Sequence, residues 1–120
     1  MYNIIFYTTK DGTSEIQEYL QKLQKKSDKD SRVNLNKIIA YINILSKHGL
    51  NMGVPYIKHI DGDIWELRPL RNRILFAYLN NNNFILLTIF MKQTQKTPYR
   101  EIERAKRYLK DFFDRSEFNE

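Results

Sequence analysis

The chain has 120 residues, which suits one domain with one hydrophobic core, and it contains no cysteine, which excludes a disulfide scaffold, cysteine-ligated zinc and a thiol nucleophile. Hydrophobic residues make up 42% and charged residues 28% of the chain, so we expect a single folded domain over residues 1–120. The formal net charge of +6 favours a polyanionic partner, nucleic acid before an anionic membrane, although the charge can also serve solubility alone.

The first half of the chain predicts a strand over residues 2–8 and then two amphipathic helices that form a helical hairpin. Ser14 followed by Gln17 is a capping-box signature, and the helix that it begins should reach about Lys26. The second helix should run from the segment 27–31 to about Lys47 and end at Gly49. The residues expected to be buried are Ile16, Tyr19, Leu20 and Leu23 in the first helix and Leu35, Ile38, Ile39, Ile42 and Leu45 in the second.

The second half predicts four strands and a closing helix. The strands are expected at residues 57–60, 64–68, 73–79 and 84–91, with a tight hairpin at Asp61-Gly62 and a polar loop over residues 80–83. Thr97 should cap the last helix, with Pro98 at its first position, and the tail 116–120 should fray. This order predicts an α+β fold with a mainly antiparallel sheet, flanked by the helical hairpin and the C-terminal helix.

Two apolar stretches bear on localisation. Residues 1–7 are too short for a signal peptide and lack a basic leader, and residues 84–91 fall far short of a membrane span. We therefore expect a cytoplasmic protein without a membrane partner.

Basic residues gather in two segments. One is 91–110, whose seven cations and two anions account for most of the net charge, and the other contains Arg68, Arg71 and Arg73. Because neighbouring antiparallel strands bring their opposite ends together, the two segments can form one phosphate-binding surface. The alternative for Arg104, Lys106, Arg107 and Lys110 is a solvated helix face.

Few other side chains are candidates for a catalytic or binding role. Glu66 is expected to pair with Arg68 or Arg73 rather than to act as a general base. A lone histidine such as His59 is more often structural, but it can also reach the basic surface. Tyr99 is either a packing aromatic or a group that stacks on a base or handles a proton. The sequence has no glycine-rich phosphate loop and no metal-ligand spacing.

Four motifs carry a family resemblance: Trp65-Glu66-Leu67-Arg68, the segment that begins Arg73-Ile74-Leu75-Phe76, Phe90-Met91-Lys92, and Lys96-Thr97-Pro98. Together they resemble the RelE/ParE toxin superfamily, and its HigB-like, phage-derived branch in particular, over roughly the C-terminal two-thirds of the chain. The resemblance implies a RelE-like fold and a toxin of a bacterial type II toxin–antitoxin system that cuts mRNA on the ribosome.

The resemblance also implies roles for individual residues. Arg68 and Arg73 match basic residues that line the RelE-type cleft, Lys92 and Lys96 match a basic segment after the last strand, and Tyr99 matches an aromatic near the closing helix. These five are the expected catalytic residues. The expected RNA contacts are Lys58, His59, Arg71 and Arg100. The sequence departs from some ribosome-dependent relatives, since it offers no clear histidine at the C-terminal end of the site.

The implied reaction is metal-independent attack by the 2′-hydroxyl, without a cofactor. Arginine suits only the stabilisation of phosphate charge, whereas a lysine crowded by other cations, such as Lys92 or Lys96, can exchange protons. The implied partners are a helix-turn-helix, HigA-like antitoxin, the ribosome and mRNA, with operator DNA reached only through the antitoxin. The alternative function is ParE-like, non-catalytic inhibition of DNA gyrase, which the same fold supports.

Overall fold

A computed structural model of the chain describes residues 1–115, so the predicted fraying of the tail 116–120 lies outside the described residues. The elements follow in the order β1 (Asn3–Phe6), α1 (Glu15–Lys25), α2 (Lys29–His48), a 3₁₀ turn η1 (Gly49–Met52), β2 (Ile57–Asp61), β3 (Ile64–Leu67), β4 (Asn72–Leu79), β5 (Asn83–Met91) and α3 (Tyr99–Arg115). No helix within residues 1–115 has both the length and the apolar character that crossing a bilayer requires.

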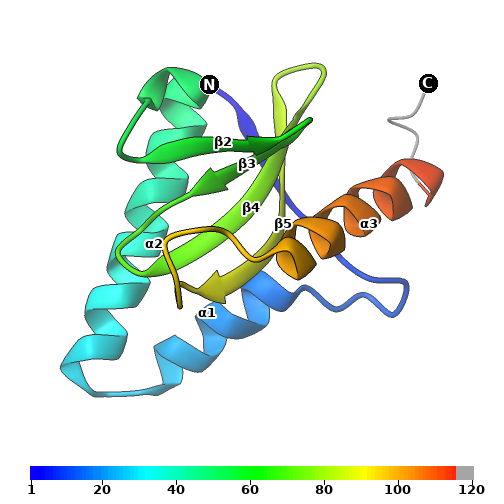
Figure 1. Ribbon diagram of the computed structural model, residues 1–120. Helices are drawn as coiled ribbons and strands as arrows, with labels where there is room; N and C mark the ends of the chain where they lie inside the picture. The colour runs from blue at the N-terminus through cyan, green and yellow to red at the C-terminus, as the bar shows by residue number, and fades with distance from the viewer. Residues whose placement is uncertain (116–120) are drawn as a thin grey trace.

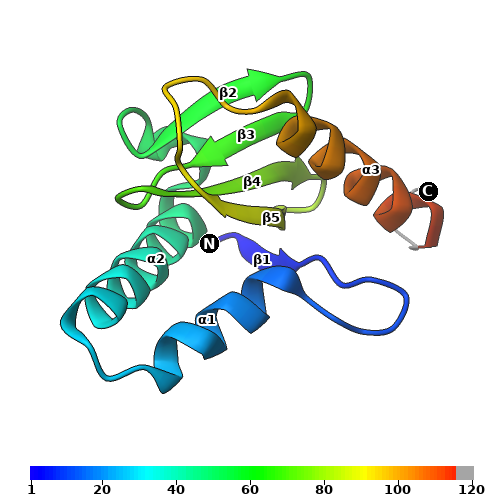
Figure 2. The same cartoon turned by 60° about the horizontal axis from the view of Figure 1, so that its bottom comes forward.

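The five strands form one sheet in the order β1-β5-β4-β3-β2 (Figure 1). Strand β1 runs parallel to β5, and every other neighbouring pair is antiparallel. The helices α1 and α2 cover one face of the sheet, and α3 covers the other (Figure 2). The predicted α+β class with a mainly antiparallel sheet is therefore confirmed, as is the placement of the helical pair and the closing helix.

Two apolar clusters fill the spaces between these layers. The first lies beneath α1 and α2 and includes Ile16, Leu23, Ile38 and Leu45, and the second lies beneath α3 and includes Ile64, Leu75, Ala77 and Ala105. The prediction that Ile39 is buried is wrong, since it is 44% exposed. Its neighbour Ile38 points about 100° away around the helix and takes the central position, so the buried stripe of α2 is narrower than expected.

Local signals in the sequence set the ends of the first two helices. The Ser14 hydroxyl accepts a hydrogen bond from the Gln17 amide at 3.2 Å, and the Asp28 carboxylate accepts one from the Ser31 amide at 3.0 Å. Gly49 ends α2 with φ of 58°, and a Cβ atom there would lie 2.7 Å from the Tyr2 ring. The predicted cap at Ser14 and stop at Gly49 are confirmed.

A β-bulge in the β2–β3 hairpin decides which side chains face α3. The register pairs Lys58 with Glu66 and His59 with Trp65, and it leaves Ile60 as an extra residue on β2. If the register of the Asp61–Ile64 pair continued without a bulge, His59 would stand opposite Glu66. Because one inserted residue moves the preceding side chains to the other face, Lys58 takes that place and His59 turns toward the α1–α2 face.

Candidate functional site

One end of the sheet collects basic residues from two strands and two loops. Neighbouring antiparallel strands bring the starts of β2 and β4 and the ends of β3 and β5 to this end. We call the residues there the basic sheet end, and they are Lys58, Arg68, Arg71, Arg73 and Lys92. The two basic segments that are distant in sequence meet directly, because Arg71 Nη2 donates to the Lys92 carbonyl at 2.9 Å.

A buried carboxylate lies at the centre of the basic sheet end. Glu66 Oε1 is 3.4 Å from Arg68 Nε and 3.8 Å from Arg73 Nε, and only 3% of the Glu66 side chain is exposed. Its other oxygen, Oε2, accepts a hydrogen bond of 2.7 Å from the Thr97 hydroxyl. The prediction that Glu66 pairs with an arginine is confirmed, and it pairs with both.

The two arginines differ in how far they are open to solvent. Arg73 is only 7% exposed, and its Nη1 donates to the carbonyls of Leu70 at 2.9 Å and Asn72 at 2.8 Å. Burial, and then the charge of Arg68, lowers the pKa of Arg73, although a guanidinium stays protonated at neutral pH. The Arg68 side chain is 26% exposed, so it is the more accessible phosphate ligand of the two.

The segment 92–98, which we call the connecting loop, joins β5 to α3 at this end. The Lys92 amide ties its start to the Arg71 carbonyl at 2.7 Å, and Thr97 ties its end to Glu66. The Pro98 carbonyl accepts the first helical hydrogen bonds, and Thr97 directs its hydroxyl to Glu66, so the prediction that Thr97 caps α3 needs correction. The long-range partner explains the difference, because a sequence pattern shows only local capping.

Lys96 and Arg100 remain on the surface next to this site. Lys96 is an exposed residue of the connecting loop, one position before Thr97. The Arg100 side chain is 86% exposed, and its nearest carboxylate is Glu101 at 3.9 Å. Both cations are therefore accessible to a ligand.

Two predicted site residues lie away from the basic sheet end. The His59 ring packs edge-on against Trp65, and its Nε2 donates to the Gly62 carbonyl at 2.7 Å, so the expectation that it reaches the basic surface is corrected by the bulge in β2. Tyr99 is 72% exposed. A hydrogen bond with Glu103, followed by the charge of that carboxylate, raises the Tyr99 pKa. The hydroxyl thus lies along α3 rather than against Glu66.

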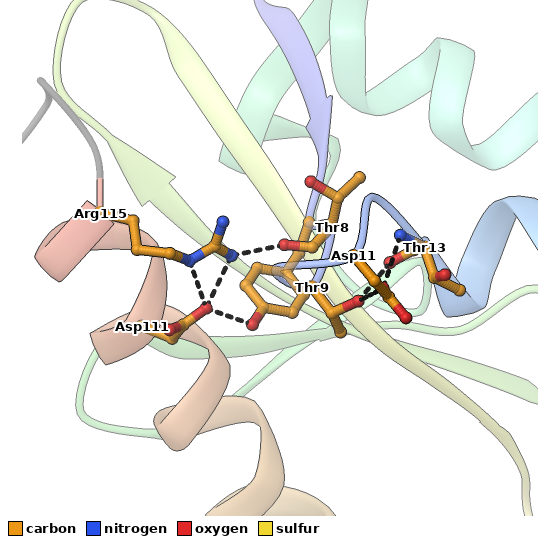
Figure 3. A network of polar contacts seen from close by, with 7 residues as sticks. Thr8, Thr9, Asp11, Thr13, Asp111 and Arg115 are labelled. Carbon is orange, nitrogen blue, oxygen red and sulfur yellow. Dashed lines mark hydrogen bonds and ion pairs between the residues drawn. The ribbon is translucent and has the colours of Figure 1, made fainter.

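Most cations of α3 are bound to carboxylates. Arg104 contacts both Glu15 and Glu101 at 2.8 Å, Lys106 contacts Asp61 at 2.6 Å, and Lys110 contacts Asp114 at 2.8 Å. Arg115 lies 2.7 Å from Asp111 and also donates to the Thr8 carbonyl (Figure 3). The basic run 91–110 is therefore largely neutralised along the helix, and within it Lys92, Lys96 and Arg107 have no ion pair in the part of the chain that the structure describes.

Two buried polar residues were not anticipated from the sequence. Asn72 is fully buried, donates to Asn34 at 2.8 Å and accepts from the Tyr19 hydroxyl at 3.2 Å, so it links α1 and α2 to the start of β4. Thr88 is fully buried, and within residues 1–115 its hydroxyl oxygen has no hydrogen-bond partner. The sequence feature that could have revealed their burial is a polar residue at the start of an apolar strand, or inside one.

The geometry suits the binding of phosphate. Two guanidinium groups share one side of the sheet end, and lysines of β2 and of the connecting loop flank them. Arginine forks and lysine ammonium groups match phosphate oxygens, and they stabilise negative charge that develops on phosphorus oxygens.

A comparison with family models gives a match over residues 18–110 to the family described as phage derived protein Gp49-like (DUF891). A comparison with curated proteins gave no match.

Proposed function

The chain belongs to the phage-derived Gp49-like family, a family of RelE-like toxins, and from this premise we propose that it is the toxin of a type II toxin–antitoxin system. The proposed activity is ribosome-dependent endonucleolytic cleavage of mRNA in the cytoplasm, as in HigB-like toxins. The observation that carries the proposal is the pair Arg68 and Arg73 held around Glu66, with Arg71 and Lys92 beside them.

In the proposed reaction, the 2′-hydroxyl of the RNA attacks the adjacent phosphorus. The bond between phosphorus and the 5′-oxygen breaks, which leaves a 2′,3′-cyclic phosphate and a 5′-hydroxyl. One group must take the proton of the 2′-hydroxyl, and another must give a proton to the leaving oxygen. Arg68 and Arg73 serve neither task, since guanidinium groups stay protonated, but they stabilise the charge on the phosphate.

The proton-transfer groups are proposed to be Lys92 and Lys96, with Tyr99 as a third candidate. Lys92 lies at the basic sheet end, and Lys96 is exposed on the connecting loop. Tyr99 bonds to Glu103 and must turn away from it to reach the phosphate. Glu66 is not proposed as the base, because its oxygens face two arginines and Thr97. Correct positioning of the mRNA by the ribosome then contributes much of the rate.

Primer extension on a defined mRNA, with and without translating ribosomes, tests this function. We expect Arg68→Gln to lower cleavage by about 100-fold, because an oxyanion-stabilising donor is removed. Lys47→Gln, at the exposed C-terminal end of α2, should cleave like the wild type. Arg68 is preferred to Arg73 because removing the buried Arg73 side chain would also disturb folding. Growth arrest without any cut would reject the nuclease and direct the search to gyrase supercoiling.

The partner proposals concern control of the toxin. A basic toxin surface requires an inhibitor, and we propose a helix-turn-helix, HigA-like antitoxin that also recruits operator DNA. Co-expression with the neighbouring reading frame, followed by size-exclusion chromatography, should give a stable complex. A chain that remains free under these conditions would contradict this partner.

A further inference from the structure

The lysine and arginine side chains divide into those with and those without a carboxylate partner. Within residues 1–115, ion pairs involve Arg68, Arg73, Arg100, Arg104, Lys106, Lys110 and Arg115. The unpaired cations in this part of the chain gather mainly at the basic sheet end and in the segment 22–37. We call this segment the helical tip, and its cations are Lys22, Lys25, Lys26, Lys29, Arg32 and Lys37.

The charge of the helical tip is not explained by helix stability. Lys22 and Lys25 lie in the last turn of α1, where a helix dipole favours cations. Lys29 and Arg32, however, lie at the N-terminal end of α2, where the dipole disfavours them. Asp28 and Asp30 are the only acidic residues among positions 22–37, and neither forms an ion pair with these cations in the described structure. Cations at this helix end lower stability, and the described structure shows no ion pair that compensates for them, so their presence points to a function.

The helical tip and the basic sheet end lie at the same end of the molecule. Asn72, which stands between Arg71 and Arg73, is hydrogen-bonded to Tyr19 of α1 and Asn34 of α2. From these two residues, both helices continue toward their connecting turn, which projects past this end of the sheet (Figures 1 and 2). The two regions therefore lie at the same end of the molecule, the helical tip on the side of α1 and α2 and the basic sheet end beside the connecting loop.

We infer that the helical tip binds the phosphate backbone of RNA and extends the basic sheet end, an inference that rests on the proposed function for the identity of the polyanion. Lysine ammonium groups on flexible stems are suited to contacts with the backbone that do not read sequence. The tip exposes no aromatic ring that could stack on a base, and Val33 is its one large exposed apolar residue. This composition favours an RNA backbone over insertion into a membrane.

Two variants with equal charge changes test the inference. The tip variant combines Lys26→Gln, Lys29→Gln and Arg32→Gln. The control variant combines Lys10→Gln, Lys47→Gln and Arg107→Gln, which are also cations without an ion pair in the described structure. The probe is a 2′-O-methyl RNA hairpin, which cannot be cleaved by 2′-hydroxyl attack. Its affinity is measured by fluorescence anisotropy over a series of KCl concentrations.

We expect the tip variant to lose at least about tenfold in affinity at low salt, and its slope of log K against log salt to fall by about 2. The control variant should stay within about threefold of the wild type, because it loses only long-range attraction. Equal losses in both variants, or wild-type binding by the tip variant, would overturn the inference. Tip-dependent binding to vesicles containing phosphatidylserine, with RNA binding unchanged, would overturn it as well.

The outcome is independent of cleavage. Arg68→Gln probes the proposed reaction by primer extension, whereas the tip variant is read by binding to an RNA that cannot react. A wild-type protein that binds the hairpin through the tip but cuts no mRNA would reject the nuclease and keep the binding surface. A protein that cuts mRNA but binds the hairpin equally well after loss of the tip cations would keep the nuclease and reject the binding surface.

Discussion

At the scale of single residues, Glu66 is a buried charge whose loss we expect to lower stability. Its carboxylate is buried beside two guanidinium groups, and the Arg73 side chain is only 8% exposed. We predict that Glu66→Gln lowers the free energy of unfolding by about 3 kcal/mol, because it leaves a buried arginine without its counter-charge. Urea unfolding followed by circular dichroism measures the change.

Asp114→Asn is the matched control for Glu66→Gln. It also removes one carboxylate from an ion pair, but Lys110 and Asp114 are 77% and 60% exposed. Its effect should stay below about 0.5 kcal/mol. If the two substitutions had equal effects, burial would not be the reason for the stability of the Glu66 cluster.

Tyr7 provides a prediction at alkaline pH. Burial, and then its hydrogen bond to Asp111, raises the pKa of Tyr7 from 10.0 to about 12. The folded state thus holds the phenolic proton more tightly, so the contribution to stability is complete below pH 10 and is lost as the pH rises through about 12. We predict that the wild type loses about 2 kcal/mol more than Tyr7→Phe between pH 9 and pH 12. Parallel losses in both proteins would contradict this assignment.

At the scale of elements, the end of the connecting loop next to α3 is held to the sheet by the side-chain hydrogen bond from Thr97 to Glu66. Thr97→Val keeps the shape of the side chain but removes the hydroxyl that donates to Glu66. We predict a loss of about 1.5 kcal/mol in unfolding free energy and faster amide hydrogen exchange in residues 92–98. If the proposed function holds, cleavage should fall about tenfold, because Lys96 is then less well positioned.

Thr94→Val is the control within the same loop. The Thr94 hydroxyl donates to the Lys96 carbonyl at 2.8 Å, so this substitution removes a hydrogen bond inside the loop and leaves the contact with Glu66. Its effect on exchange should be confined to the turn at residues 94–96. Equal loosening of the whole loop in both variants would mean that Thr97 has no special role.

Much of the element structure could be predicted from local patterns. The alternation of apolar residues placed the helices and strands, and Ser14 and Gly49 fixed helix ends through local rules. The side to which His59 points could not be predicted, since it depends on the single extra residue Ile60 in β2. A bulge has no firm signature in one sequence, and it moves every side chain before it to the other face.

At the scale of the whole molecule, the sequence located the charged segments but not which charges remain free. For the cations of α3 the sequence left open a phosphate-binding surface or a solvated helix face, whereas carboxylates from α1, the β2–β3 hairpin and α3 itself bind most of them. Such partners are far apart in the chain, as Glu15 and Arg104 show. The meeting of Arg71 with Lys92 was predictable because antiparallel pairing follows from strand order.

The same long-range pairing joins the layers of the molecule. Glu15 at the start of α1 accepts two hydrogen bonds from Arg104 of α3, at 2.8 and 2.9 Å, and a third from the Tyr108 hydroxyl. This contact connects the helix on one face of the sheet with the helix on the other. We predict that Glu15→Gln lowers the unfolding free energy by about 1 kcal/mol at low salt, because the pair is partly exposed.

Glu18→Gln is the control that distinguishes the contribution of the Glu15–Arg104 contact from that of the helix dipole. Glu18 also lies in the first turn of α1, and it forms no ion pair within residues 1–115. Both variants lose the favourable charge at the helix start, so only the additional loss in Glu15→Gln reports the contact with Arg104. In urea unfolding, this additional loss should shrink at about 1 M KCl, where salt screens exposed pairs. Equal losses in the two variants would show that the contact between Glu15 and Arg104 does not contribute to stability.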